Sequence, residues 1–407
     1  MRIQRYHSRL SFRSRRRRRS GCLPSVIMLG ILVGVGALSL TWLQGKLFQP
    51  LSAPLTGSSL NDRLVAALQA FDRGDLDTVV DLTRQVLNEQ PDQPEAIVLL
   101  ARTLIYRSYS EYNRGVDRQS ALELTTGAVE RAPTNLDLLA IHAFAQSAGG
   151  NPAGAAETAR RVLDRDPDHA LARTAMALAY GNVGSFEVAL RESQRALEGR
   201  GWTIDALRAL AISYSDVGDY EAATTTVDRA ISMNAHLLPL YFEKALYALQ
   251  LGDVDSATHA YYQVVTFDAR NAKARLRLCE LSSTMRERDA AVRYCGEVTE
   301  LAPSWADGWY QLGREYFLQG NFESARDSFH RCSVLQVVQG VPVEERRFEC
   351  WYLQGQAAEI LGDCDSLVAT YNEFRSMTAD VDVQQTWTYP PEGPPGCAAR
   401  AGLNESP

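Results

Sequence analysis

The stretch "WYQLGREYFLQGNFESA", residues 309–325, decides the fold because its pattern recurs along the chain. With Trp309 as the fourth residue of a unit, steps of 34 residues towards the N-terminus give units that begin at 306, 272, 238, 204, 170 and 136. Each unit opens with one stretch of helical periodicity and closes with another. The repeat, rather than any single motif, is therefore the first guide to structure.

Small residues recur at fixed places in these units. The eighth position is Gly313, Cys279, Ala245, Ala211, Ala177 and Ala143, and the twentieth position is alanine in all six units. Small side chains let two antiparallel helices approach closely. The fifteenth position is glycine in every unit except the one that begins at 272, where it is Arg286. Glycine there suits the left-handed backbone that ends a first helix.

Three further units extend the pattern. One fits residues 60–93, and a second begins at 94 if eight extra residues are allowed in "YRSYSEYNRGVDRQ", residues 106–119. A degraded unit begins at Phe348. The spacing thus predicts about nine helical hairpins over residues 60–374.

The pattern resembles the tetratricopeptide repeat family, whose signature is W-x2-L-G-x2-Y followed by A-x3-F. The matching residues are Trp309, Leu312, Gly313, Tyr316, Ala325 and Phe329. The resemblance implies an all-α, right-handed superhelical solenoid of about nine helix-turn-helix repeats whose first helices line a concave groove. It also implies that the groove binds a peptide or helix of a partner protein. Arg286 in a turn and Cys295 at the usual Phe position depart from the family pattern.

In this family, positions 2, 5, 9, 12 and 13 of each unit build the concave surface. Carried over, they give the candidate partner-binding residues Phe144, Leu178, Arg208, Ile212, Phe242, Leu246, Tyr310, Arg314, Phe317 and Tyr352. This mixture of aromatic, aliphatic and arginine side chains suits an extended segment or an amphipathic helix. The alternative is that some of the aromatic residues pack between adjacent repeats. The chaperone-binding carboxylate clamp of the family is not expected, because Leu64 and Leu68 stand where it needs Lys and Asn.

The N-terminal residues predict a membrane anchor. Residues 1–22 form an arginine-rich tip, and 23–43 run for 21 residues without a charge, enough to span about 31 Å as a helix. The positive-inside rule would place the tip in the cytoplasm and the repeats outside it. We therefore expect a single-pass protein of the cell membrane with an extracytoplasmic repeat domain, joined by a linker at 44–59. A cleaved signal peptide is the rival reading.

The charge is divided unevenly along the chain. The net charge is −7, but nine arginines lie in residues 1–21, which leaves 33 basic against 49 acidic residues, or −16, for the rest. Beside an apolar run, the arginines are expected to set orientation and contact anionic lipid rather than nucleic acid. No nucleic-acid partner is expected.

Motifs for catalysis or cofactor binding are not found in the sequence. It has no H-E-x-x-H zinc motif, no phosphate-binding loop ending in Lys-Ser or Lys-Thr, and no G-x-S-x-G elbow. The six histidines are scattered. We therefore expect neither an enzyme nor a metal or other cofactor.

Six cysteines follow residue 278: Cys279, Cys295, Cys332, Cys350, Cys364 and Cys397. An even number on the oxidising side of a membrane suggests disulfides. Cys279 and Cys295 take positions 8 and 24 of one unit, whose helices face each other, which favours that pair. Cys332 with Cys350 would bridge two units, and Cys364 would then hold the tail through Cys397. Buried free thiols are the alternative.

The tail, residues 375–407, is rich in Pro and Gly and is expected to be irregular. The sequence thus predicts a membrane-anchored scaffold for protein–protein interaction. Two alternatives stay open: a secreted or periplasmic accessory subunit of an enzyme complex, released by signal cleavage, and a self-assembling structural array.

Overall fold

The chain divides into two compact units, Met1–Ser58 and Ser59–Pro407. The computed structural model describes residues 59–379, Trp387 and Cys397, all of which lie in the second unit. The predicted tip, residues 1–22, and the apolar segment 23–43 lie outside the described residues, as does most of the linker and most of the tail.

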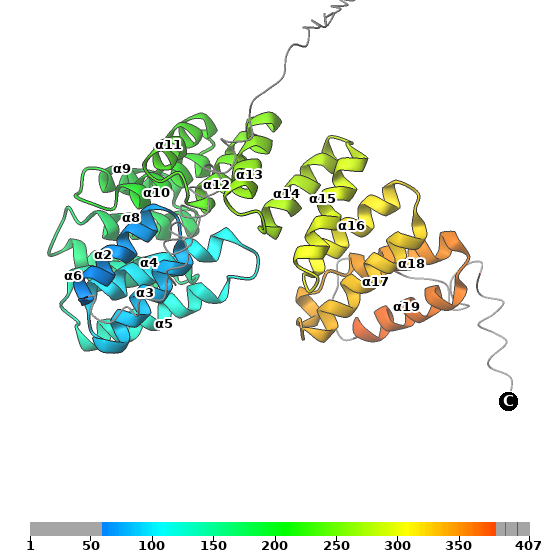
Figure 1. Ribbon diagram of the computed structural model, residues 1–407, viewed down its shortest axis with the longest axis horizontal. Coiled ribbons are helices and arrows are strands. Elements are labelled where there is room, and N and C mark those ends of the chain that lie inside the picture. The colour runs from blue at the N-terminus through cyan, green and yellow to red at the C-terminus, as the bar shows by residue number, and fades with distance from the viewer. Residues whose placement is uncertain (1–58, 380–386, 388–396, 398–407) are drawn as a thin grey trace, which may run out of the picture. The chain divides into compact units, whose positions relative to one another are not determined.

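In residues 59–379 the structure is all helical, with eighteen α-helices, one short 3₁₀ helix and no strand. The expectation of an all-α repeat fold is confirmed for this part of the chain. Consecutive helices pack as nine hairpins, each of which forms one repeat (Figure 1). The hairpins are α2 (Leu60–Asp72) with α3 (Leu76–Glu89), α4 (Pro94–Ser110) with α5 (Val116–Arg131), α6 (Leu136–Ala148) with α7 (Pro152–Leu163), α8 (Ala170–Asn182) with α9 (Phe186–Ala196), α10 (Thr203–Asp216) with α11 (Tyr220–Met233), α12 (Leu238–Gln250) with α13 (Val254–Phe267), α14 (Ala272–Thr284) with α15 (Arg288–Leu301), α16 (Ala306–Leu318) with α17 (Phe322–Val338), and α18 (Glu349–Leu361) with α19 (Cys364–Met377).

The turn inside a repeat combines a left-handed residue with a capping side chain. In the eighth repeat Gly320 has φ 79°, and the next residue, Asn321, accepts a hydrogen bond from the backbone N–H of Ser324 at 3.2 Å. This bond satisfies one of the free N–H groups at the start of α17. The left-handed residue recurs in the seventh repeat, where Arg286, with φ 63°, replaces glycine, but Glu287 at the start of α15 makes no capping hydrogen bond there. A residue with a Cβ atom is disfavoured in this conformation.

Inside each hairpin, the small residue at the eighth position lets the two helices meet. A Cβ atom built on Gly313 of α16 would lie 2.8 Å from the ring of Phe329 on α17, which is fully buried. That distance is shorter than a van der Waals contact. The aromatic ring therefore fills the space that a larger eighth residue would need.

We expect Gly313→Leu to lower the free energy of unfolding by about 1–3 kcal/mol, because the added side chain overpacks the contact with Phe329. Chemical denaturation of the variant and the wild type measures the difference. Gly296→Leu is the matched control, since a Cβ atom on Gly296 of α15 meets nothing within 4 Å. An unchanged midpoint for Gly313→Leu would show that α16 and α17 do not approach as described.

The predicted single-pass membrane localisation is corrected by the structure. Across residues 59–379, no helix is both long enough and apolar enough to cross a membrane. The longest of these helices, α4 and α17, have 17 residues each. The 21-residue apolar run that motivated the prediction is not part of the described structure.

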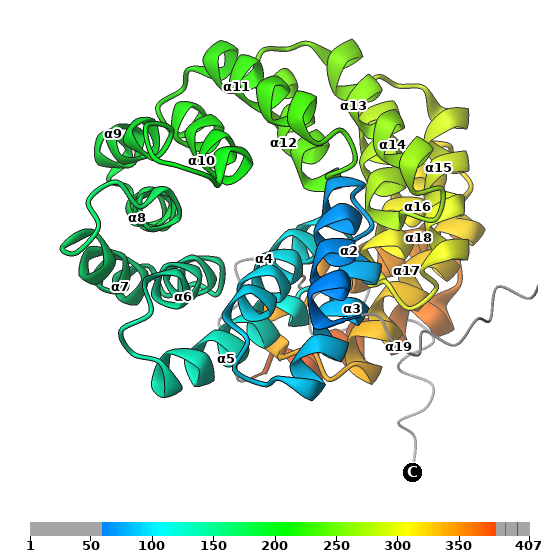
Figure 2. The same ribbon diagram turned by 60° about the vertical axis from the view of Figure 1, so that its left-hand side comes forward.

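The repeats follow a curved path that brings distant parts of the chain together (Figure 2). The helix α4 of the second repeat packs against α12 of the sixth. One core cluster joins Phe71, Leu99 and Tyr106 of the first two repeats to Leu207 and Leu240 of the fifth and sixth. The first repeats thus share buried apolar surface with repeats that lie more than a hundred residues later in the sequence.

Candidate functional site

A groove on the first helices of the sixth and seventh repeats is the best candidate for a binding site. It has a volume of about 640 Å³. Its lining includes Tyr109, Pro239, Phe242, Glu243, Leu246, Leu249, Val254, Tyr261, Lys273, Arg277, Glu280, Leu281 and Thr284. Phe242 and Leu246 were expected from the sequence at the fifth and ninth positions of the sixth repeat. The structure therefore brings two of the sequence candidates into one concavity.

The groove presents apolar side chains to solvent. Leu246 is 49% exposed, which is high for a leucine, while Phe242 is half-buried with its ring centroid 6.0 Å from that of Tyr261. Successive turns of α12 place these two side chains on the same face of the helix. A contiguous apolar surface of this kind is typical of binding sites.

A lysine borders the apolar part of the groove. Lys273 lies with its Nζ atom 4.3 Å from the ring centroid of Phe242 and donates a hydrogen bond to the backbone oxygen of Tyr109 at 2.5 Å. Burial, helped by the charge of Arg277, lowers the pKa of Lys273 to about 8. The ammonium group is thus partly shielded from water and held by a carbonyl dipole and an aromatic face.

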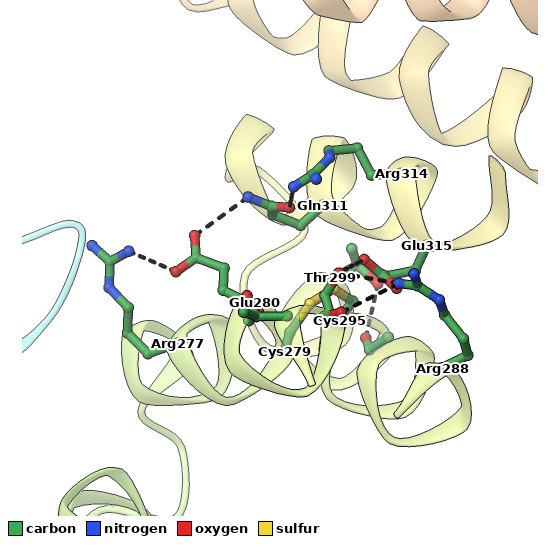
Figure 3. Close-up of a disulfide and its surroundings, with 12 residues drawn as sticks. Arg277, Cys279, Glu280, Arg288, Cys295, Thr299, Gln311, Arg314 and Glu315 are labelled. Carbon is green, nitrogen blue, oxygen red and sulfur yellow. Dashed lines mark hydrogen bonds and ion pairs between the residues drawn. A yellow bond between two sulfur atoms is a disulfide. The ribbon is translucent and has the colours of Figure 1, made fainter. Parts of the chain in front are cut away.

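A chain of polar side chains runs along the same concave face from α14 to α16 (Figure 3). Arg277 donates to Glu280 at 2.6 Å, Gln311 donates to Glu280 at 3.3 Å, and Arg314 donates to Gln311 at 2.9 Å. The bond between Gln311 and Glu280 joins the neighbouring first helices α14 and α16, while the other two bonds lie within one helix and help to orient these side chains. The two ends of this series of hydrogen bonds are guanidinium groups, each able to donate further hydrogen bonds to acceptor atoms of a ligand.

Other sequence candidates are already in contact with the rest of the chain. Phe144 is only 2% exposed and belongs to the core of the second to fourth repeats. Arg208 is 7% exposed, binds Glu243 at 2.6 Å and lies over the ring of Tyr109. Leu178 and Ile212 are half-buried. These positions therefore do not form a continuous open surface with the groove.

The candidates of the last two repeats lie outside the groove lining. Tyr310 is covered by the guanidinium of Arg347, 4.4 Å from its ring centroid. Phe317 contacts Phe322 with ring centroids 5.2 Å apart, and Tyr352 contacts Trp387 at 5.9 Å. All three are half-buried. Trp387 belongs to the predicted tail, and this residue covers part of the last repeat.

The six cysteines lie in three close pairs, which are the pairings considered from the sequence. The Cα atoms of Cys279 and Cys295 are 5.3 Å apart, those of Cys332 and Cys350 5.9 Å, and those of Cys364 and Cys397 5.4 Å. These separations suit disulfides. The first pair joins α14 to α15 beneath the polar chain (Figure 3). Oxidation of the three pairs in solution stays a prediction.

Sequence reasoning missed several lining residues. Lys273 and Glu280 occupy the second and ninth positions of the seventh repeat, so the family register could have identified them. Arg277, at the sixth position, lies outside that register. Tyr109 comes from the insertion of the second repeat, and no local signal places it beside the seventh repeat. Among the residues that the structure describes, no group of three His, Cys, Asp or Glu side chains is arranged to hold a metal ion.

Two segments of the chain, residues 208–274 and 306–333, match models of the tetratricopeptide repeat. No curated protein matches the chain. A chain in the crystal structure of the APC/C hetero-tetramer Cut9–Hcn1 is similar with a TM-score of 0.53 and 16% identity, over 79% of this chain and 61% of that one. This chain thus spans less than two thirds of that relative, and at this identity the likeness concerns the fold.

Two bacterial structures are also similar. The C-terminal part of a TPR repeat-containing protein from Cytophaga hutchinsonii has a TM-score of 0.48 at 13% identity, over 59% of this chain and 96% of that one. A tetratricopeptide repeat protein from Parabacteroides merdae has a TM-score of 0.39 at 18% identity, over 64% and 99%.

Proposed function

This chain is a tetratricopeptide repeat protein, and from that premise we propose that it is a scaffold that binds a partner protein in the groove of α12 and α14. Proteins of this family generally mediate protein–protein interactions, and their fold is typical of non-catalytic scaffolds. The absence of enzymatic activity stays a prediction. What supports the groove is the exposed apolar surface of Leu246 next to Phe242 on a concave face.

The chemistry of the groove favours an amphipathic helix or an extended segment with apolar anchors. An aliphatic or aromatic side chain of the partner would bury Leu246 and the open part of Phe242. A cavity of about 640 Å³ accommodates a few such side chains rather than a whole domain. The partner is therefore expected to insert a short segment.

Charges beside the apolar surface favour an acidic flank on that segment. Glu243 is paired with Arg208, and Glu280 accepts from Arg277. Lys273 donates to a carbonyl oxygen and is also attracted by the carboxylates of Glu111 and Glu243, whereas Arg314 donates to the uncharged side chain of Gln311. A carboxylate on the partner would complement Arg314.

Leu246→Asp is the direct test of this proposal. Peptides selected from a random display library on the full-length chain should bind the variant about 30-fold or more weakly, because a central apolar anchor typically contributes about 2 kcal/mol or more. Isothermal titration with the selected peptides measures the affinities.

Met233→Asp is the matched control. Met233 is 54% exposed, but it lies at the end of the second helix α11 and not in the groove. Its substitution should leave the affinities unchanged. Equal binding of the selected peptides to the wild type and to Leu246→Asp would reject the groove as the binding site. Light scattering of the full chain tests the alternative of self-assembly, which would give large oligomers.

A further inference from the structure

The second repeat contains an insertion that the helical hairpin itself does not need. Its first helix, α4, is 17 residues long, whereas α6, α8, α12, α14 and α16 each have 13. The additional turn extends the helix by about 6 Å. It carries Tyr109 and Ser110, and Glu111 and Tyr112 follow directly. We call residues 109–112 the strap.

The strap caps a helix of a distant repeat. The carboxylate of Glu111 accepts hydrogen bonds from the backbone N–H groups of Ala272 at 2.8 Å and Lys273 at 3.0 Å, at the start of α14. Asn271, which is fully buried, donates to the backbone oxygen of Ser110 at 3.0 Å. Free N–H groups at a helix start favour a negative charge. The second repeat thus adds a second cap to α14, beside that of Asn271, whose own side-chain oxygen accepts a hydrogen bond from the Ala274 N–H at 2.9 Å.

Two further contacts extend the strap along the later repeats. The backbone oxygen of Tyr109 accepts the hydrogen bond from Lys273 that borders the groove. The ring of Tyr112 stacks on Trp305, just before α16, with centroids 4.2 Å apart and planes inclined by 10°. One short segment therefore contacts both the start of the seventh repeat and the residue that precedes the eighth.

Buried contacts beneath the strap show that the closure is extensive. Arg102 of α4 binds Asp205 of α10 through two hydrogen bonds, at 2.6 and 3.1 Å. Asn234 donates to the backbone oxygen of Phe71 at 2.9 Å, and its side chain is almost fully buried. Tyr106 lies within the core shared with the fifth and sixth repeats.

We propose that the strap closes the N-terminal repeats on the seventh and eighth and thereby confines the partner to the concave face from the sixth repeat onward. Tyr109 lines the groove at the side where α4 crosses it, so a bound segment meets the strap there and cannot continue over the concave face of the fifth repeat. Tyr109 also covers the guanidinium of Arg208 in the fifth repeat, which agrees with a limit to the binding surface at that point. The location of the partner rests on the proposed function, whereas the closure itself does not.

Hydrogen exchange tests the closure without any ligand. In the double variant Glu111→Ala/Tyr112→Ala of the full chain, the amides of Ala272 and Lys273 should exchange about tenfold faster or more, because they lose their acceptor. Asn113→Ala, which alters an exposed side chain of the same loop, should leave the exchange unchanged. Tyr112→Ala alone keeps the cap and should accelerate exchange around Trp305 only. Exchange that is equal in all variants would overturn the closure.

Cross-linking tests the confinement of the partner. A photo-reactive residue replaces either Thr284 or Asp216, which are exposed and occupy the thirteenth position of the seventh and fifth repeats. The probe is a peptide selected on the full-length chain. Cross-links are expected from the Thr284 position only, and the Asp216 position should gain them when Glu111 and Tyr112 are both alanine.

The outcomes separate the two proposals. Cross-links from both positions in the chain with an intact strap would overturn the confinement and leave the groove function standing. A failure of the double strap variant to extend the cross-links to the Asp216 position would also overturn it. The absence of cross-links from the Thr284 position would instead contradict the groove function, while the exchange result would still decide the closure.

Discussion

Replacing Asp205 by alanine is expected to lower the free energy of unfolding by about 3–5 kcal/mol, the largest effect we expect from a single charge. The side chain of Asp205 is fully buried and receives both hydrogen bonds of the Arg102 guanidinium, which is itself 14% exposed. The substitution leaves that guanidinium charged and without its carboxylate. Its remaining neighbours, the rings of Phe71 and Trp202, at 4.2 and 5.1 Å from its central carbon, replace only part of the lost interaction.

Chemical denaturation of the full chain measures this effect, and a solvent-exposed ion pair provides the control. Asp92 and Arg131 also form an ion pair, but their side chains are 71% and 51% exposed. Asp92→Ala should cost less than about 1 kcal/mol, because water replaces the lost interaction. Equal effects of the two substitutions would show that Arg102 and Asp205 are not buried together, and the fifth repeat would then not contact the second as described.

Trp387→Ala is expected to destabilise the last repeat by about 3–5 kcal/mol, as is usual for truncation of a buried tryptophan. Trp387 is 6% exposed and contacts Tyr371 and Phe374 of α19, with ring centroids 5.3 and 5.6 Å apart. It also lies against Gly355 of α18, where a Cβ atom would collide with the indole ring. The indole ring thus covers apolar surface of α18 and α19 that would otherwise be exposed.

The loss of stability in Trp387→Ala should be confined to the last repeat, because each repeat contacts mainly its neighbours. Hydrogen exchange of α18 and α19 should accelerate in Trp387→Ala, while that of the first six repeats stays unchanged. Val338→Ala, at a position 76% exposed at the end of α17, serves as the control and should change neither region. If the amides of α18 and α19 exchange in Trp387→Ala at the same rate as in the wild type, Trp387 does not cap the last repeat.

The repeat fold was accessible from sequence because its determinants are local. A small residue at the eighth position and a left-handed residue at the fifteenth act within one hairpin, and the 34-residue spacing multiplies the signal along the chain. Gly313 facing Phe329 is an example, since both residues belong to the same repeat. Even Arg286, which departs from the glycine pattern, takes the left-handed conformation that its position requires.

The candidate site was only partly accessible from sequence. The family register indicated Phe242 and Leu246, which do line the groove, but it also indicated Phe144 and Arg208, which are buried. A register specifies which way a side chain points from its own helix. It does not specify whether another repeat covers that side chain.

The sequence by itself determined the helical repeats and the positions where their helices meet, because each depends on residues close together in the chain. Only the tertiary structure decided which part of the concave face remains open. The curvature accumulated over several repeats brings Tyr109 and Glu111 of the second repeat onto the seventh, and Arg102 onto Asp205 of the fifth. Small rotations between successive repeats add up to bring the second repeat against the fifth and the seventh. The sequence of any one repeat does not specify this summed rotation.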